Sequence, residues 1–198
     1  MSRVFILVGI VVLVFAWAGP LPSLIPGSFA AHMVLHMSVV GVGVPLLAIG
    51  LAMRSTSPSA SAMWPIVVSV LDFVVIWGWH SPYLHHLSRS EPWALALEQA
   101  SFAGVALLVW FVAFAGSSLA GAISLFFTSM HMTVLGALIG LAPRPIYPGH
   151  HHGEAWLGLN AVQDQQMGGV VMLAIGGIVY LAGALWLVAR VLRPRVAT

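Results

Sequence analysis

The sequence predicts an all-α fold, a polytopic membrane helical bundle of about six transmembrane helices that forms one domain over residues 1–198. Composition is the first observation, because hydrophobic residues make up 60% of the chain and charged residues only 6%, whereas soluble domains have about 45–50% and about 25%. The second observation is that the apolar runs are long and continuous, unlike the short alternating segments of a membrane β-barrel. Together they exclude a soluble domain, a disordered chain and a nucleic-acid binder with a basic face.

Six apolar segments have the length and separation of membrane-spanning helices. A helix crosses the ~30 Å hydrocarbon layer with about 20 residues, and breaks rich in Gly, Pro and Ser lie at residues 19–22, 55–61, 81–82, 116–117 and 143–166. The predicted spans are residues 4–18, 29–53, 63–79, 93–115, 118–142 and 167–189. The first also resembles a secretory signal, because Arg3 precedes an apolar stretch that ends at Ala16-Trp17-Ala18. Its cleavage would leave the remaining topology unchanged.

The arginines set the orientation of these spans. With the N-terminus inside, the inner side carries five arginines and the outer side two, and an excess of positive charge marks the cytoplasmic side. The inner residues are Arg3, Arg54, Arg190, Arg193 and Arg195, and the outer ones are Arg89 and Arg144. Both termini are therefore predicted to be cytoplasmic. The chain has no cysteine, which excludes disulfides and thiolate metal sites.

Histidine is unusually frequent, and this topology gathers it on the outer side. Nine of the 198 residues are His. His32 and His36 fall in the outer half of the second span, and His131 lies near mid-depth in the fifth. The other six lie at the outer end of the third span or in outer connections: His80, His85, His86, His150, His151 and His152. Because Glu98 and Asp164 also lie toward the outer side, we expect a polar cluster that faces outward.

The pattern of histidine and methionine indicates copper chemistry. In His32-Met33-x-x-His36-Met37 both residue types repeat at a spacing of four, which places each pair on one helix face. His131 lies between two further methionines. Imidazole and thioether without thiolate suit copper, Cu(I) above all. The predicted metal ligands are His32, His36, His80, His131, Met33 and Met37. Packing methionines and hydrogen-bonded histidines remain the alternative interpretation.

Acidic residues inside a membrane need partners, because each costs about 2.5–3.5 kcal/mol at mid-span. Glu98 is expected to pair with His32, His36 or His80. Asp72 lies mid-span, where His131 is the one candidate cation. We assign Glu98 and Asp164 to hydrogen bonds that orient the imidazoles or to contacts with a partner protein.

The second span also contains Pro45, below the histidine pair. Proline removes a backbone donor and clashes with the preceding turn, so it kinks or breaks a helix. We therefore expect a kink at this point of the span.

Short motifs in a fixed order resemble those of a known family. They are His32-Met33-x-x-His36-Met37 with Pro45 downstream, Trp79-His80-x-Pro82-x-Leu84, Leu97-Glu98-Gln99-Ala100-Ser101-Phe102, Trp110-Phe111, Leu135-Gly136-Ala137, Pro145-x-Tyr147-Pro148 and Asp164-Gln165-x-x-Gly168-Gly169-x-x-Met172. This set resembles the multi-span CtaG family of cytochrome c oxidase assembly factors, over roughly residues 29–172. Two departures stand out. The family often has Glu-His where this chain has Glu98-Gln99, and many members are longer.

The resemblance implies a multi-pass protein of the bacterial inner (cytoplasmic) membrane that contacts lipid and cytochrome c oxidase subunits while a haem–copper oxidase is assembled. Together with the residue chemistry, it predicts a factor that is not an enzyme and that binds or hands over Cu(I) at the outward-facing cluster. Two alternatives stay open. One is a structural accessory subunit of a respiratory oxidase complex. The other is a b-haem electron carrier, which the crowding of two histidines on one helix face disfavours. No nucleic-acid partner is expected.

Overall fold

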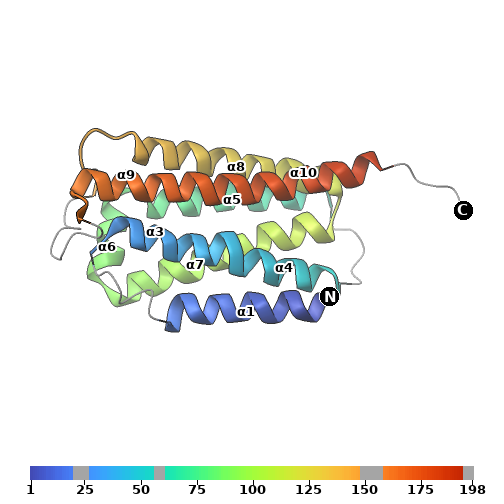
Figure 1. Ribbon diagram of the computed structural model, residues 1–198. Coiled ribbons are helices and arrows are strands. Elements are labelled where there is room, and N and C mark those ends of the chain that lie inside the picture. Colours follow the sequence, from blue (N-terminus) through green and yellow to red (C-terminus); the bar gives the residue numbers. More distant parts are fainter. Residues whose placement is uncertain (20–26, 56–60, 148–157, 194–198) are drawn as a thin grey trace, which may run out of the picture.

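The computed structural model describes residues 1–19, 27–55, 61–147 and 158–193, and all the regular structure in these ranges is helical. The helices lie side by side and run in alternating directions along one long axis (Figure 1). Their bounds are α1 Ser2–Ala18, α3 Phe29–Ser38, η1 Val39–Gly43, α4 Val44–Ala52, α5 Met63–Trp79, α6 Pro82–Ser90, α7 Pro92–Ala115, α8 Ser118–Gly140, α9 Ala161–Val171, η3 Met172–Gly177 and α10 Ile178–Leu192. The all-α membrane bundle is thus confirmed.

The bundle has two different ends. α1 begins and α10 ends at one of them, which we call the terminal end (Figure 1). The short helix α6 lies at the opposite end, together with the first turns of α3 and α9, and we call this the α6 end (Figure 1). Placing the start of α1 and the finish of α10 together agrees with an even number of membrane crossings.

Length and hydropathy identify the helices that can cross a membrane. Four are long and apolar enough among the described residues: Phe29–Ala52, Pro92–Ala115, Ser118–Gly140 and Ala161–Leu192. α5 and α6 pass the same test only as a pair, which is bent by 71°. The predicted first span corresponds to α1, an apolar helix of 17 residues.

The last long helix begins six residues before the predicted start of the sixth span. Asn160 accepts a hydrogen bond from the Gln163 backbone N–H, and the Gln163 side chain accepts one from the Asn160 backbone N–H. This reciprocal capping box satisfies two backbone donors at the helix start. The polar residues just before residue 167 therefore belong to the first turns of α9.

A turn of π-helix interrupts the second span where the sequence predicts a kink. Residues Val39–Gly43 form the wide turn η1, and Pro45 follows in the first turn of α4. A π-turn leaves the i−4 hydrogen bond unmade, so the proline that cannot donate it is accommodated there. Glycines let α1 lie close on this region, since a Cβ at Gly9 would be 2.8 Å from the Gly43 carbonyl oxygen.

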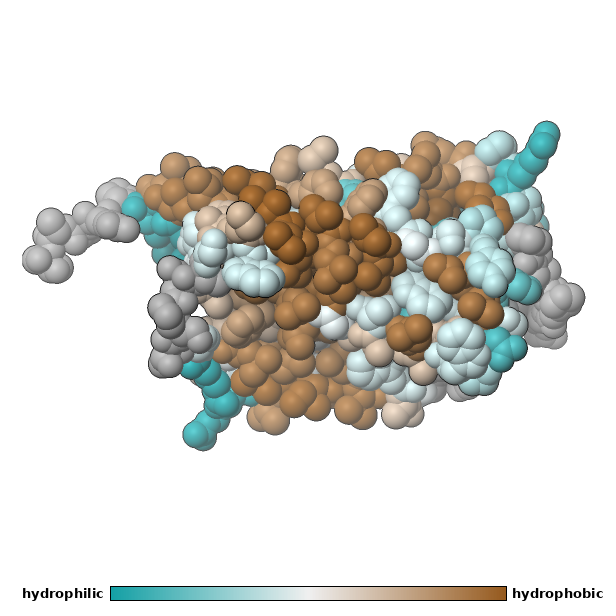
Figure 2. Space-filling view, turned by 180° about the vertical axis from the view of Figure 1, so that it is seen from behind, coloured by the Kyte–Doolittle hydropathy of each residue, from teal (hydrophilic) through white to brown (hydrophobic). Residues whose placement is uncertain are grey.

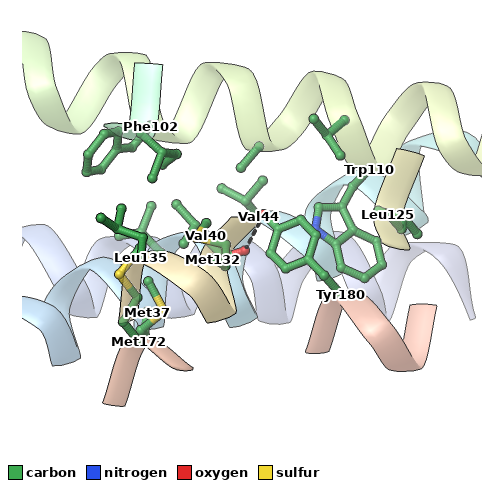
Figure 3. Packing of buried hydrophobic residues seen from close by; sticks show 14 of the residues in the cluster. Met37, Val40, Val44, Phe102, Trp110, Leu125, Met132, Leu135, Met172 and Tyr180 are labelled. Atoms are coloured by element: carbon green, nitrogen blue, oxygen red, sulfur yellow. Dashed lines mark hydrogen bonds between the residues drawn. The ribbon is translucent and has the colours of Figure 1, made fainter. Parts of the chain in front are cut away.

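Large apolar side chains fill the interior of the bundle. Met37 and Met172 lie at one end of the buried set in Figure 3, and Trp110 lies beside Tyr180 at the other. The Tyr180 hydroxyl donates to the Val40 carbonyl oxygen at 3.3 Å, so this deep polar group is satisfied. Figure 2 shows hydrophobic residues over the middle of one face and the most hydrophilic ones near its two ends. This distribution is that of a protein surrounded by lipid.

Candidate functional site

Seven side chains from four helices come together at the α6 end. We call them the histidine cluster: His32 and His36 from α3, His80 at the end of α5, His85 and Arg89 from α6, and Glu98 and Gln99 from α7. Six are buried, and the Arg89 side chain is 29% exposed. Residues up to 67 positions apart in sequence thus form one polar site in an apolar bundle.

The helical spacing of His32 and His36 brings their rings together as the sequence indicates. Their ring centroids are 4.0 Å apart, and one Nε2 lies 2.6 Å from the other, so the two imidazoles are in direct contact. Two nitrogens that bind one metal tetrahedrally, at about 2.0 Å each, are about 3.3 Å apart. A metal bound through both Nε2 atoms would therefore require the rings to part by about 0.7 Å.

Glu98 is the negative charge at the centre of the cluster. Its Oε2 lies 3.6 Å from His32 Nε2, 3.7 Å from His36 Nε2 and 3.6 Å from an Arg89 nitrogen. Ser88 donates to its Oε1 at 3.0 Å. The carboxylate is 1% exposed. Since a buried charge needs opposite charge and hydrogen bonds, His32 and His36 are the partners that its position in the fourth span predicted.

His80 presents a nitrogen that suits a ligand. Its Nδ1 lies 2.7 Å from the Ile76 carbonyl oxygen, an acceptor, so Nδ1 carries the proton. The lone pair is then on Nε2, which is buried and has no hydrogen-bond partner among the described residues. A backbone carbonyl that fixes the tautomer in this way is the usual arrangement for histidines that bind metals.

Tyr147 contacts both His80 and His85 and holds them in place. The Tyr147 hydroxyl donates to the His80 carbonyl oxygen at 2.9 Å. The Tyr147 ring lies against Phe29 and His85, with centroid distances of 4.9 Å and 4.3 Å. Burial raises the pKa of the Tyr147 phenol above its usual value, so this residue remains a hydrogen-bond donor at neutral pH.

His85 is a cluster residue that the ligand prediction did not include, because the sequence placed it in a loop. The chain instead forms α6, which begins with Pro82 in the first turn, a favourable position for proline. His85 is 2% exposed. One ligand atom from each of His32, His85 and Glu98 lies within 4.8 Å of the other two. The spacing of His85, Ser88 and Arg89 is that of one helix face, but the direction of this face depends on the bend between α5 and α6.

Arg89 and Gln99 each donate a hydrogen bond to one ring of the histidine pair. An Arg89 nitrogen lies 3.0 Å from His32 Nδ1, and Gln99 Nε2 lies 3.2 Å from His36 Nδ1. Trp17 of α1 donates to the Gln99 side-chain oxygen at 3.2 Å, which fixes the amide. Gln99, where the CtaG family often has histidine, therefore positions His36. The sequence analysis did not predict that Arg89 and Gln99 position the two imidazoles.

The two predicted thioether ligands pack against a different helix. Met33 Cγ lies 3.1 Å from the position of a Cβ at Gly168, and Met37 Sδ lies 3.6 Å from that at Gly176. Both side chains are buried. They contact α9 and η3, whereas His32 and His36 contact residues of α6 and α7. The structure thus places these thioethers in the packed core, with the imidazoles on another side of α3.

His131, another predicted ligand, is in a second buried polar site. Its Nε2 lies 3.2 Å from Asp72 Oδ2, which joins α8 to α5. The His131 ring is also 5.4 Å from that of Phe73 and 5.5 Å from that of Phe127. His131 is thus the partner of Asp72, as the sequence analysis expected. None of the contacts described for His131 joins it to the histidine cluster.

Asp164 caps α3. Its two oxygens accept from the Ser28 hydroxyl at 2.7 Å and from the backbone N–H groups of Phe29 and Ala30 at 2.6 Å and 3.3 Å. A carboxylate at a helix N-terminus is favoured by the free N–H groups and by the helix dipole. Asp164 therefore attaches α9 to the helix that carries His32 and His36.

The histidines His150, His151 and His152 lie outside the described residues. So do Pro148 of the Pro-x-Tyr-Pro motif and Arg195 of the inner arginines.

The fold and the cluster together define a class: a multi-pass membrane protein with a buried His/Glu site at one end of its bundle. The chain matches the family of cytochrome c oxidase caa3 assembly factors (Caa3_CtaG) over residues 2–194. It belongs to this family, so the resemblance seen in the motifs is confirmed. Comparison with curated proteins and with solved structures found no match.

Proposed function

We propose that this protein is a non-enzymatic assembly factor of the bacterial inner membrane that binds copper as cargo in the histidine cluster and passes it to a haem–copper cytochrome c oxidase. The family supplies the link to oxidase assembly. The copper step rests on one observation, the convergence of His32, His85 and Glu98 in the cluster that also holds His80, whose Nε2 has no hydrogen-bond partner in the described part of the chain.

The donor set fits a copper ion in transit. Imidazole nitrogens and one carboxylate are its candidate ligands, and imidazole binds Cu and Zn well. Arg89 and Gln99 already occupy the Nδ1 atoms of His32 and His36. A bound cation must also displace the contact between the two Nε2 atoms. Because binding breaks existing hydrogen bonds, part of its free energy is lost, which favours release to a partner over permanent storage.

The cluster lies on the side that the arginine distribution assigns to the outside. Of the six described arginines, four belong to the terminal end (Arg3, Arg54, Arg190 and Arg193) and two to the α6 end (Arg89 and Arg144). The histidines belong to the α6 end, where copper would be received and released outside the cytoplasm.

A pair of adjacent histidines provides the test. His85 is buried in the cluster, and His86 is exposed on the same helix. Detergent-purified protein is loaded with Cu(I) and washed, and copper per chain is measured by elemental analysis. About one copper per chain is expected for the parent chain and for His86→Ala, with a loss of most copper in His85→Ala. In cells, His85→Ala should lower oxidase activity at an unchanged level of this protein.

The same measurements define the outcomes that would contradict the proposal. Equal copper in both variants would mean that His85 is not a ligand. No copper in the parent chain would leave a structural accessory subunit, whose histidines only hold helices together. That alternative predicts co-purification with the oxidase at a fixed ratio.

A further inference from the structure

A deep apolar groove lies in the half of the bundle that the histidine cluster does not occupy. Its volume is about 800 Å³, within the range of ligand-binding cavities. α1, η1 with α4, and α10 form its walls, and Trp110 and Phe114 of α7 also line it. Ala182 is a small residue of this lining.

We propose that this groove binds one anionic phospholipid of the leaflet at the terminal end, with its acyl chains in the groove and its phosphate at Arg190. Apolar surface dominates the lining, and Arg190 has the one charged side chain among the residues that form it. Basic pockets between transmembrane helices on the cytoplasmic side are typical sites for anionic lipid head groups.

The length of the groove fits one leaflet. Along α10 it extends from Val179 to Arg190, and eleven residues of helix at 1.5 Å each span about 16 Å. That is half of the ~30 Å hydrocarbon layer. A transmembrane helix of a partner protein would need a groove of about twice this length. A phospholipid ends at the head-group level, which is the depth of Arg190 at the end of the last helix.

The rim of the groove has the residues of a membrane interface. Arg190 lies over the Trp186 ring, with its Cζ 5.0 Å from the ring centroid, and tryptophan and arginine are both favoured at the head-group level. None of the ion pairs found among the described residues involves Arg190.

Net positive charge at the terminal end favours anionic lipid around the protein, whereas Arg190 is the arginine that lines the groove. The described arginines there are Arg3, Arg54, Arg190 and Arg193. The described acidic residues all lie elsewhere: Asp72 within α5, and Glu91, Glu98 and Asp164 toward the α6 end. The positive charge at this end attracts anionic lipid, and no described carboxylate there opposes the attraction.

The test measures lipid bound to the purified protein. Delipidated protein is mixed with phosphatidylglycerol or phosphatidylcholine in detergent, and bound lipid per chain is counted by native mass spectrometry. Ala182→Trp fills the groove, and Arg190→Gln removes its charge. The matched controls are Ala96→Trp, an exposed alanine of α7 outside the groove, and Arg193→Gln, an exposed arginine at the same end.

The parent chain and both controls should retain about one phosphatidylglycerol per chain. Ala182→Trp should lose it, and Arg190→Gln should lose about fivefold in preference for phosphatidylglycerol over phosphatidylcholine, the effect of one arginine near a membrane surface. Ala182 is exposed, so its variant should fold, which the unchanged melting temperature verifies.

Three results would overturn the proposal. The first is equal bound lipid in Ala182→Trp and the parent chain, and the second is equal lipid preference in Arg190→Gln and the parent chain. The third is that Ala182→Trp loses a co-purifying protein while its bound lipid is unchanged. The last would assign the groove to a partner helix.

Discussion

The substitution Asp164→Asn tests whether Asp164 anchors α3 without being a ligand of the proposed copper site. The side chain accepts three hydrogen bonds at the start of α3, and it is 6% exposed. Asparagine retains one acceptor oxygen but loses the charge. Hydrogen bonds to charged groups contribute about 1.5–3 kcal/mol each, against about 1 kcal/mol for neutral ones.

The expected loss of stability follows from these contacts. Weakening two strong bonds and leaving one donor unpaired costs about 2–3 kcal/mol. For a chain of this size that corresponds to a decrease in melting temperature of about 4–12 °C. Copper per folded chain should stay within about twofold of the parent value, because Asp164 contacts the first turn of α3 and not an imidazole.

The assay is thermal unfolding in detergent followed by copper analysis of the folded fraction. Glu91→Gln is the matched control, the same change from carboxylate to amide at an exposed residue of the α6 end, and it should alter stability by less than about 0.5 kcal/mol. An unchanged melting temperature for Asp164→Asn would refute the anchoring argument. Loss of copper without loss of stability would instead place Asp164 in the metal site.

Two further changes test the packing and the second polar site. Gly169→Ala would place a Cβ 2.4 Å from a backbone nitrogen of α8 and should lower the melting temperature. Gly104→Ala is the control, because its Cβ would have no atom within 4 Å, and it should leave the melting temperature equal or higher. Equal effects of the two changes would contradict the close packing of α9 on α8. His131→Gln retains a donor for Asp72 and should leave copper per chain unchanged, and a loss of copper would show that His131 belongs to the metal site.

The sequence could predict which residues share a face of one helix. His32 and His36 are four apart in a clear apolar segment, so their contact follows from helical geometry. The cost of burying Glu98 predicts that cations lie beside it. Composition alone establishes the membrane bundle.

Contacts that depend on how helices pack could not be predicted in this way. His85 enters the cluster because the chain bends by 71° between α5 and α6, and no local pattern encodes that angle. Met33 is one residue from His32, yet a rotation of about 100° per residue turns it toward α9. Asp164 is identified as a cap only when α9 is seen beside α3, more than 130 residues away.

Each of the two π-turns rotates the side-chain directions of the helix beyond it, so the two halves of the same helix can face different neighbours. η1 and η3 lie at the same depth, since a Cβ at Gly41 would be 2.9 Å from the Ile175 side chain. In a uniform α-helix His36 and Gly43, seven residues apart, would project in nearly the same direction. A wide turn adds about one residue, which rotates everything beyond it by about 100°. The half of the span with His36 can therefore face α6 and α7 while the half with Gly43 faces α1. The direction in which His36 faces is therefore set separately from the contact between α1 and α4.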